Sequence, residues 1–381
     1  MRNGLLLGAS LGVCLGLAEA TVRVFGIGPL IQTVWHGNFR FSDNPVLRYE
    51  LEPLSPDGEF RINAAGMRDR EYPVRKPDHT FRIAVLGDSI AYGHGVPQDQ
   101  VFSAQLEALL GAYYADAGVR FEVLNFAVTG YGFAQVVETL RSRVLDFDPD
   151  LAIYAYCLND PQEYSLELAG LESERTRARE RYARVWAEGA RHLLERSHLY
   201  VWLRYRYEAW RRPARPPDPG RDDPQFAALH AGRLADYLAG LHRSEATWGP
   251  VEAGLSGLAA LGRRHDLPIH VAIVPLLEDL ESYPLVPVHE QLAAAFAANS
   301  MPVLDLLGAY ALFEERRGHQ IGLEPLHPSS EGHAFTAVAL LRHLLVSGAL
   351  PGLGARDFDR MLRGRRPESA FARIAQQAAR A

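Results

Sequence analysis

Residues 81–90 read Phe81-Arg82-Ile83-Ala84-Val85-Leu86-Gly87-Asp88-Ser89-Ile90, and this stretch decides the fold. A short apolar run that ends at a glycine is typical of a fully buried strand in a parallel sheet. In open α/β sheets, the chemistry gathers outside the carboxyl ends of the strands. The sequence therefore predicts that Ser89 lies at that edge. Asp and Ser are also common in ordinary turns after a strand, so the rest of the chain must decide between a catalytic serine and a turn residue.

Further strands and helices alternate along the chain. The strand candidates are Arg82–Leu86, Phe121–Val128, Leu151–Cys157, Pro268–Val274 and Met301–Leu307. The helical patterns are Val101–Tyr114, Phe133–Leu145, Val251–Arg264, Glu290–Asn299 and Ser330–Val346. Such alternation means parallel strands joined by right-handed crossovers. We therefore expect an α/β fold, a three-layer α/β/α sandwich around a five-stranded parallel sheet with a flavodoxin-like strand order.

The composition fits one large domain with additions. A chain of 381 residues that is 48% apolar and 23% charged can bury a full core. The net charge of −6 does not favour a nucleic-acid partner. Cys14 lies in an apolar leader and Cys157 in a predicted strand, so the two cysteines imply no disulfide framework.

Residues 1–35 form the apolar leader. Arg2 precedes an apolar run that ends near Ala18, a length that fits either a signal-peptide core or a short membrane anchor. Ala18-Glu19-Ala20 offers a cleavage site, whereas residues 21–35 stay largely apolar and favour retention. We expect an N-terminal apolar helix that anchors the domain at the cell membrane, outside the cytoplasm. The alternative is secretion after cleavage near Ala20.

Other segments flank or interrupt the sandwich, which spans residues 81–348. Residues 36–80 are turn-rich and predict a collar, in which Arg61–Arg68 lies against the domain and Arg68 is structural rather than in contact with substrate. A helical insert rich in arginine and aromatic residues covers about residues 165–246. This insert is either a set of solvated helices or a lid that selects the acyl donor or lies on an anionic membrane. Residues 349–381 form an Arg-rich tail.

Polar or glycine residues follow four of the predicted strands. Ser89 follows the first strand, Gly130 the second, Asn159 the third and His327 the fifth. These residues therefore share one edge of the sheet. Acyl transfer needs a nucleophile, a base and donors aimed at the developing oxyanion. Ser89 is the candidate nucleophile and His327 the candidate base, with Glu324 to orient the imidazole. The backbone amides of Ser89 and Gly130 and the side-chain amide of Asn159 would form the oxyanion hole.

These residues resemble the sequence blocks of the SGNH, or GDSL-type, hydrolases. Gly87-Asp88-Ser89 matches the first block, Gly130 the second, Leu158-Asn159-Asp160 the third, and Leu326-His327-Pro328 with Gly332-His333 the fifth. The collar and leader resemble those of membrane-tethered bacterial members. The resemblance implies a flavodoxin-like sheet and Ser-His chemistry on esters or thioesters, or acyl transfer, without a metal or other cofactor.

The sequence departs from the family pattern at two positions. Glu324 stands where the family usually has Asp, which leaves Asp305 as a reserve partner for His327 and a Ser-His dyad as a further possibility. Leu158 stands where the family prefers Gly and would narrow the pocket.

His289-Glu290 begins a zinc-protease pattern but lacks its second histidine, because position 293 is Ala. His333 is interpreted as a structural histidine, and Asp88 and Asp160 as structural acceptors.

The leading hypothesis is an exported, membrane-tethered serine esterase that acts on an O-acyl group of a glycan or lipid. One alternative is an acyltransferase that uses the same site. The other is a catalytically silent carbohydrate-binding or scaffold protein that kept the fold. The sequence does not indicate an oligomeric state.

Overall fold

The computed structural model describes the residues 10, 12, 14–18, 20–21, 38–57, 60–113, 118–162, 165–172, 199, 203, 223–318 and 320–356. Contacts divide the chain into two compact units. The larger unit comprises residues 38–165 and 224–381, and the smaller one comprises residues 1–37 and 166–223. In the smaller unit the described part is short and largely helical, and it includes residues 14–18 and 166–172.

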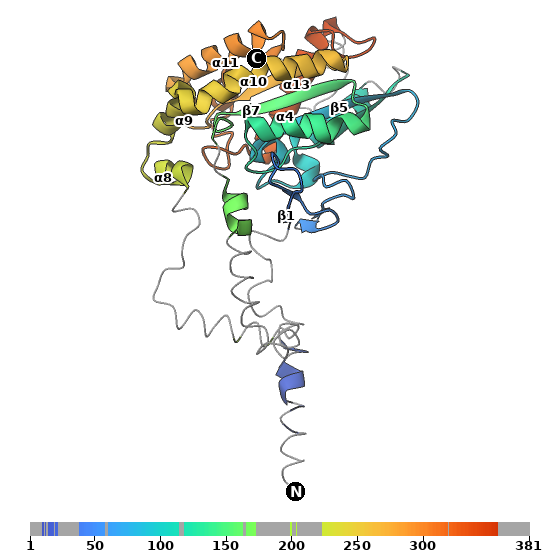
Figure 1. The fold of residues 1–381 in the computed structure, drawn as a ribbon, viewed down its shortest axis with the longest axis vertical. Coiled ribbons are helices and arrows are strands. Elements are labelled where there is room, and N and C mark those ends of the chain that lie inside the picture. The colour runs from blue at the N-terminus through green and yellow to red at the C-terminus, as the bar shows by residue number, and fades with distance from the viewer. Residues whose placement is uncertain are drawn as a thin grey trace. The chain divides into compact units, whose positions relative to one another are not determined.

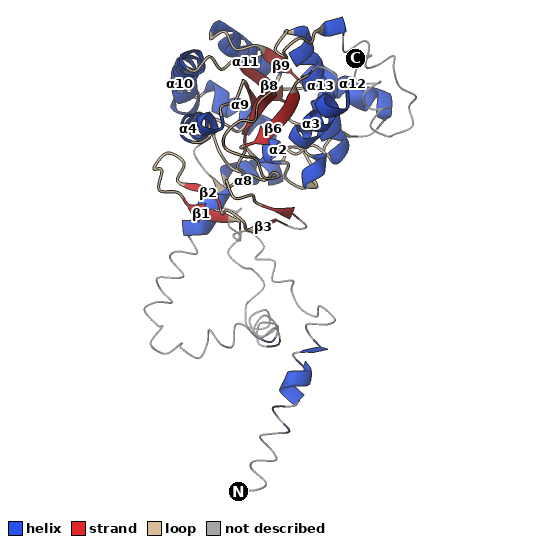
Figure 2. Ribbon diagram, turned by 90° about the vertical axis from the view of Figure 1, so that its right-hand side faces the viewer, coloured by secondary structure: helices blue, strands red, loops and turns tan. Residues whose placement is uncertain are grey.

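A five-stranded parallel sheet forms the centre of the larger unit (Figures 1 and 2). Its strands are β5 (Thr80–Gly87), β6 (Arg120–Asn125), β7 (Leu151–Cys157), β8 (Ile269–Val274) and β9 (Val303–Asp305). The spatial order β6-β5-β7-β8-β9 confirms the predicted flavodoxin-like arrangement. Every residue of β7 and β8 is buried, which is what helices on both faces of a sheet require.

Helices cover both faces of the sheet, so the three predicted layers are present. Figure 2 shows α3 (Phe102–Tyr113), α12 (Leu307–Arg317) and α13 (Ser330–Val346) on one side of the strands. On the other side lie α4 (Phe133–Ser142), α9 (Leu234–Arg243), α10 (Glu245–Arg264) and α11 (Val286–Ala298). Two shorter helices are α2 (Ser89–Tyr92) and α8 (Pro224–His230).

Several element ends differ from the predicted ones. The second strand ends at Asn125 rather than Val128, where the Asn125 side chain accepts a hydrogen bond from the Ala127 N–H. The chain still runs beside β5 up to Val128, because the N–H groups of Phe126 and Val128 donate to the carbonyl oxygens of Val85 and Gly87. The fifth strand is Val303–Asp305, shorter than the predicted Met301–Leu307, and Leu307 already begins the unpredicted α12. Helix α11 begins at Val286 with a proline in its first turn, a position that proline tolerates.

The collar consists of two short hairpins and a tight turn. Strand β1 (Phe39–Phe41) pairs with β2 (Tyr49–Leu51), and β3 (Pro56–Asp57) pairs with β4 (Phe60–Arg61). In the turn that follows, the Asn63 side chain accepts hydrogen bonds from the N–H groups of Ala65 and Met67, and Met67 is buried. The collar contacts the sandwich through the Tyr49 hydroxyl, which donates to the Thr129 carbonyl oxygen, and through the Ala65 carbonyl oxygen, which accepts from Arg143.

The predicted leader helix lies largely outside the described residues. Among the residues that the structure does describe, no helix has the length and apolarity needed to cross a bilayer. Most of the predicted insert and of the Arg-rich tail also lies outside them. Residues 224–246, which the sequence assigns to the insert, form α8, α9 and the start of α10 and belong to the larger unit.

Candidate active site

Ser89 is the first residue of α2, directly after the carboxyl end of β5. The backbone of Gly87 has φ +153°, and a Cβ there would lie 2.8 Å from the Ala155 carbonyl oxygen and 2.9 Å from the Ala91 Cβ. Only glycine therefore fits the sharp turn that leads into the serine. The Asp88 side chain caps α2 by accepting a hydrogen bond from the Ile90 N–H. In the sequence Gly-Asp-Ser, the glycine allows the sharp turn and the aspartate caps α2, and together they place Ser89 at the edge of the sheet.

His327 reaches Ser89 from a loop 238 residues further along the chain. Its Nε2 lies 2.8 Å from the Ser89 Oγ. The loop is held by the Leu323 N–H, which donates to the His327 carbonyl, and by the Leu277 N–H, which donates to the Pro325 carbonyl. Backbone hydrogen bonds therefore fix the position from which the imidazole points at the serine.

Glu324 is the acidic partner of His327. One of its carboxylate oxygens contacts the His327 Nδ1. Partial burial acts to raise the pKa of Glu324, but the hydrogen bond to His327 and the nearby positive potential of His327 and His94 outweigh it, so this pKa lies below its usual value. The reserve candidate Asp305 instead contacts the His289 Nδ1 at 2.8 Å and accepts from the Leu307 N–H. Although the family usually has Asp at this position, the longer Glu324 side chain also contacts the His327 imidazole.

Gly130 and Asn159 follow the two strands that flank β5. Gly130 has φ +73° and lies in the turn after β6. Asn159 follows β7, and its buried Oδ1 has no hydrogen-bond partner among the described residues. The two loops pack against each other, because a Cβ on Gly132 would lie 2.8 Å from the Asp160 carbonyl oxygen. The predicted oxyanion donors therefore share the edge that carries Ser89.

Two buried carboxyl groups lie beneath this edge. Asp88 is 1% exposed, and burial raises its pKa. Asp160 accepts hydrogen bonds from the Tyr154 hydroxyl and the Cys157 N–H, and burial together with the neighbouring Asp88 raises its pKa well above the usual range. Both side chains act as acceptors in loop turns, which is the structural role that the sequence predicts.

The remaining sequence-predicted histidines have structural partners. The buried His333 accepts a hydrogen bond from the Phe102 N–H through Nδ1, and burial lowers its pKa to about 3. His289 lies between Asp305 and the Tyr283 hydroxyl. Neither residue contacts Ser89, so the interpretation of His333 as structural is confirmed.

His94 is a member of the site that the sequence did not single out. Its ring centroid lies 4.8 Å from that of His327, with 41° between the ring planes. His94 is exposed, and its N–H donates to the Ser89 carbonyl at 3.0 Å. The signal in the sequence is weak, since it consists only of a histidine between two glycines, five residues after the serine.

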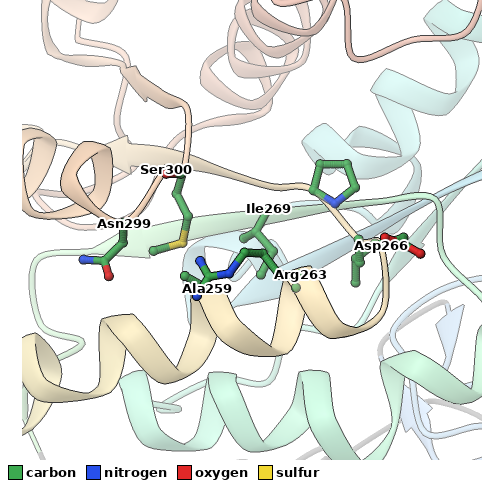
Figure 3. Close-up of a pocket in the computed structure, with 10 residues that line it drawn as sticks. Ala259, Arg263, Asp266, Ile269, Asn299 and Ser300 are labelled. Atoms are coloured by element: carbon green, nitrogen blue, oxygen red, sulfur yellow. The ribbon is translucent and has the colours of Figure 1, made fainter.

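A pocket at the other end of the sheet does not adjoin this triad. Figure 3 shows this pocket, which has a volume of about 160 Å³ and a lining that includes Arg263, Asp266, Ile269 and Ser300. Ile269 is the first residue of β8, so the pocket lies at the amino edge of the sheet, opposite the edge of Ser89. It therefore plays no part in the chemistry of Ser89 and His327.

Comparison with solved structures finds several low-identity matches to this chain. LAE5, an α/β hydrolase enzyme from the metagenome of Lake Arreo in Spain, matches with a TM-score of 0.40 and 14% identity over 71% of this chain and 97% of that one. A catalytic mutant of Axe2, an acetylxylan esterase from Geobacillus stearothermophilus, matches with a TM-score of 0.38 and 15% identity over 69% and 94%. TesA matches with a TM-score of 0.38 and 14% identity over 71% and 99%.

The family assignment comes from the sequence match rather than from these structures. No curated protein sequence shows significant similarity to the chain. The model of the GDSL-like lipase/acylhydrolase family matches residues 85–335, which is more than half of the chain. This span begins within β5, just before Ser89, and includes Gly130, Asn159 and His327. The chain therefore belongs to the GDSL-like lipase/acylhydrolase family of hydrolases.

Proposed function

We propose that the protein is a serine esterase that hydrolyses an O-acyl ester of a glycan or lipid through a covalent acyl-enzyme on Ser89. The observation that carries this proposal is the chain of contacts from the Ser89 Oγ to the His327 Nε2, at 2.8 Å, and from the His327 Nδ1 to Glu324. A serine activated by an imidazole that is itself oriented by an acid is the arrangement that nucleophilic acyl transfer requires.

The first half-reaction acylates the serine. The Ser89 hydroxyl gives its proton to His327 Nε2 as the Oγ attacks the ester carbonyl carbon. The ionised Glu324 stabilises the imidazolium that forms, which agrees with the lowered pKa of this carboxyl. The amides of Ser89, Gly130 and Asn159 receive the developing oxyanion, and each such donor contributes about 2.7–4 kcal/mol of transition-state stabilisation. The imidazolium then protonates the leaving alcohol.

The second half-reaction releases the acyl group. Water enters in place of the alcohol, and His327 takes a proton from it as its oxygen attacks the acyl carbonyl carbon. The tetrahedral intermediate then collapses with cleavage of the bond from the acyl carbon to the Ser89 Oγ, to which the imidazolium returns the proton, so that the carboxylic acid leaves and Ser89 is free again. An acceptor alcohol that enters the same position would receive the acyl group instead, which is the acyltransferase alternative. Both reactions need the same triad, so the partition between water and alcohol distinguishes them.

Covalent labelling tests the proposal. A fluorophosphonate probe should label the wild-type protein, and Ser89→Ala should abolish the labelling. Hydrolysis of p-nitrophenyl esters of increasing acyl length should then give the acyl preference, and added glycerol should leave the rate of acid release unchanged if water is the natural acceptor. A wild-type protein that neither labels nor hydrolyses any of these esters would favour the silent binding or scaffold protein.

We also propose that residues 1–35 hold the catalytic domain at the cell membrane on its outer side. The support is the sequence alone, namely Arg2 followed by an apolar run and then by a largely apolar stretch to Trp35. Fractionation of cells that produce the full chain tests this proposal. The protein should stay with the membranes, whereas release of a shortened chain into the soluble fraction would indicate cleavage near Ala20.

A further inference from the structure

A buried arginine of the collar contacts the segment that carries Ser89. Arg68 is 7% exposed although it precedes the family match, which begins at residue 85. Its Nη1 donates to the carbonyl oxygens of Tyr92 at 3.0 Å and of Gly93 at 3.2 Å, and its Nη2 donates to the carbonyl oxygen of Val96 at 2.8 Å. The guanidinium therefore joins three carbonyl groups of one short turn.

The backbone of this turn, residues 89–96, is closed by hydrogen bonds from the N–H groups of Gly93 and His94 to the Ser89 carbonyl and from the Val96 N–H to the Gly93 carbonyl. Arg68 adds donors from outside the turn. Helix α2 has only four residues and ends at Gly93, whose φ is +85°. The last carbonyl groups of a helix lack partners within it and need outside donors. Gly95, with φ +80°, repeats the left-handed conformation two residues later. Arg68 supplies the donors, and its Cζ lies 4.9 Å from the centroid of the Tyr92 ring.

The same turn carries one partner of the proposed proton transfer and lies beside the other. It begins with Ser89, and it carries His94, whose ring lies 4.8 Å from the His327 ring. A Cβ on Gly95 would lie 2.8 Å from the Leu323 Cδ1, so the turn also adjoins the loop of His327. A shift of the turn would therefore move the nucleophile and the ring that lies beside the base together.

We propose that Arg68 is a positioning residue of the active site, which holds the turn 89–96 so that Ser89 and His94 meet His327. The inference rests on the proposed esterase function and adds the collar to the catalytic unit. Its guanidinium donates to backbone carbonyl groups from a buried position, so it acts through the turn and not on the substrate. Misplacement of reacting groups by about 1 Å can cost about 100-fold in rate, so such a role is measurable.

The chain offers a matched control for the collar. Arg143, which follows α4, donates through Nη2 to the carbonyl oxygens of Ala65, at 2.6 Å, and Gly66, at 3.2 Å. Arg143 therefore holds the collar turn from the sandwich. Among the described residues, no hydrogen bond joins Arg143 to the turn 89–96. Arg143→Ala loosens the collar alone, whereas Arg68→Ala also releases the turn of Ser89.

The experiment compares Arg68→Ala, Arg68→Lys and Arg143→Ala with the wild type. For each protein, kcat and KM for p-nitrophenyl acetate, the rate of fluorophosphonate labelling and the thermal unfolding midpoint are measured. We expect Arg68→Ala to lower kcat and the labelling rate by about 100-fold, with little change in KM, because Arg68 does not contact the ester. Arg143→Ala should lower the unfolding midpoint while keeping kcat near the wild-type value.

Arg68→Lys decides the case if Arg68→Ala does not fold. Lysine keeps the charge but lacks the planar fork that reaches three carbonyl groups. We expect it to fold and to lose kcat by about tenfold or more. A folded Arg68→Lys protein with wild-type kcat and labelling rate would overturn the inference, as would equal kcat losses in Arg68→Ala and Arg143→Ala. A wild-type protein without esterase activity or labelling would instead refute the proposed function itself.

Discussion

Replacement of Glu324 by glutamine tests which acid serves His327. The substitution keeps the size of the side chain and an oxygen that can accept from Nδ1, and it removes the charge that stabilises the imidazolium. A hydrogen bond to a charged group contributes about 1.5–3 kcal/mol. Because 41% of the Glu324 side chain is exposed to screening water, the lower part of this range, about 1.5–2 kcal/mol, applies. Each 1.4 kcal/mol is about tenfold, so we expect kcat to fall about 10- to 30-fold.

The assay is steady-state hydrolysis of p-nitrophenyl acetate at pH 8, with KM expected to stay near the wild-type value. Asp305→Asn is the control, because Asp305 contacts His289 and not His327. It should keep kcat within about threefold of the wild type, as expected for a group outside the site. Wild-type kcat in Glu324→Gln would show that the serine and histidine act as a dyad. A larger loss in Asp305→Asn than in Glu324→Gln would refute the assignment of the acid.

Three further predictions concern stability. Burial raises the pKa of Asp69 to about 7. The folded protein therefore keeps a proton that the unfolded chain releases above about pH 4, and the free energy of unfolding should fall as the pH rises from about 4 to 7, by at most about 1.4 kcal/mol per pH unit. Urea unfolding of Asp69→Asn at several pH values should lack this part of the pH dependence. Arg82 is fully buried, with its Nε 2.8 Å from Glu122 and its Nη atoms on the carbonyl oxygens of Pro73, Val74 and Phe147, so Arg82→Ala should cost about 3–5 kcal/mol in urea unfolding. A smaller loss in Arg82→Met/Glu122→Leu would assign the difference to the buried Glu122 carboxylate, which then keeps, among the described residues, only the more exposed Arg70 and Arg120 as partners. Gly87→Ala should be destabilised by at least about 1–3 kcal/mol and lose esterase activity, because the new Cβ meets backbone and φ is +153°; a stable, active variant would contradict the turn geometry.

The sequence predicted the sheet because its signals are local. Each central strand is an apolar run that ends at a glycine, an asparagine or a short turn, and one edge therefore collects Ser89, Gly130 and Asn159. The strand order also agrees with the sequence, because alternating strands and helices constrain it. The pairing of His327 with Ser89 was inferred from the residues that follow the strands and from the family blocks, not from the strand order, because His327 lies beyond α12. The choice between Glu324 and Asp305 was not decidable from spacing, because it depends on the course of the loop after α12.

What the sequence did not reveal depends on contacts between distant segments. His94 is an exposed histidine in a glycine-rich turn, and only the fold brings it beside His327. Arg68 is one arginine among many, and its burial against three carbonyl groups is set by the packing of the collar. The regular strand ends at Asn125, whose side chain accepts from the Ala127 N–H, although the apolar residues Phe126 and Val128 still donate to carbonyl groups of β5.

The strand order has a consequence for synthesis of the protein. After β5 and β6 have paired, strands β7, β8 and β9 emerge in sequence and add one after another to the same growing edge. The sheet can therefore assemble in the direction of translation, with little rearrangement of earlier strands. His327 follows the last strand, so a nascent chain that stops before it carries a formed sheet and an unactivated serine. Hydrolytic competence thus arrives only after all five strands and the loop of His327 have been synthesised.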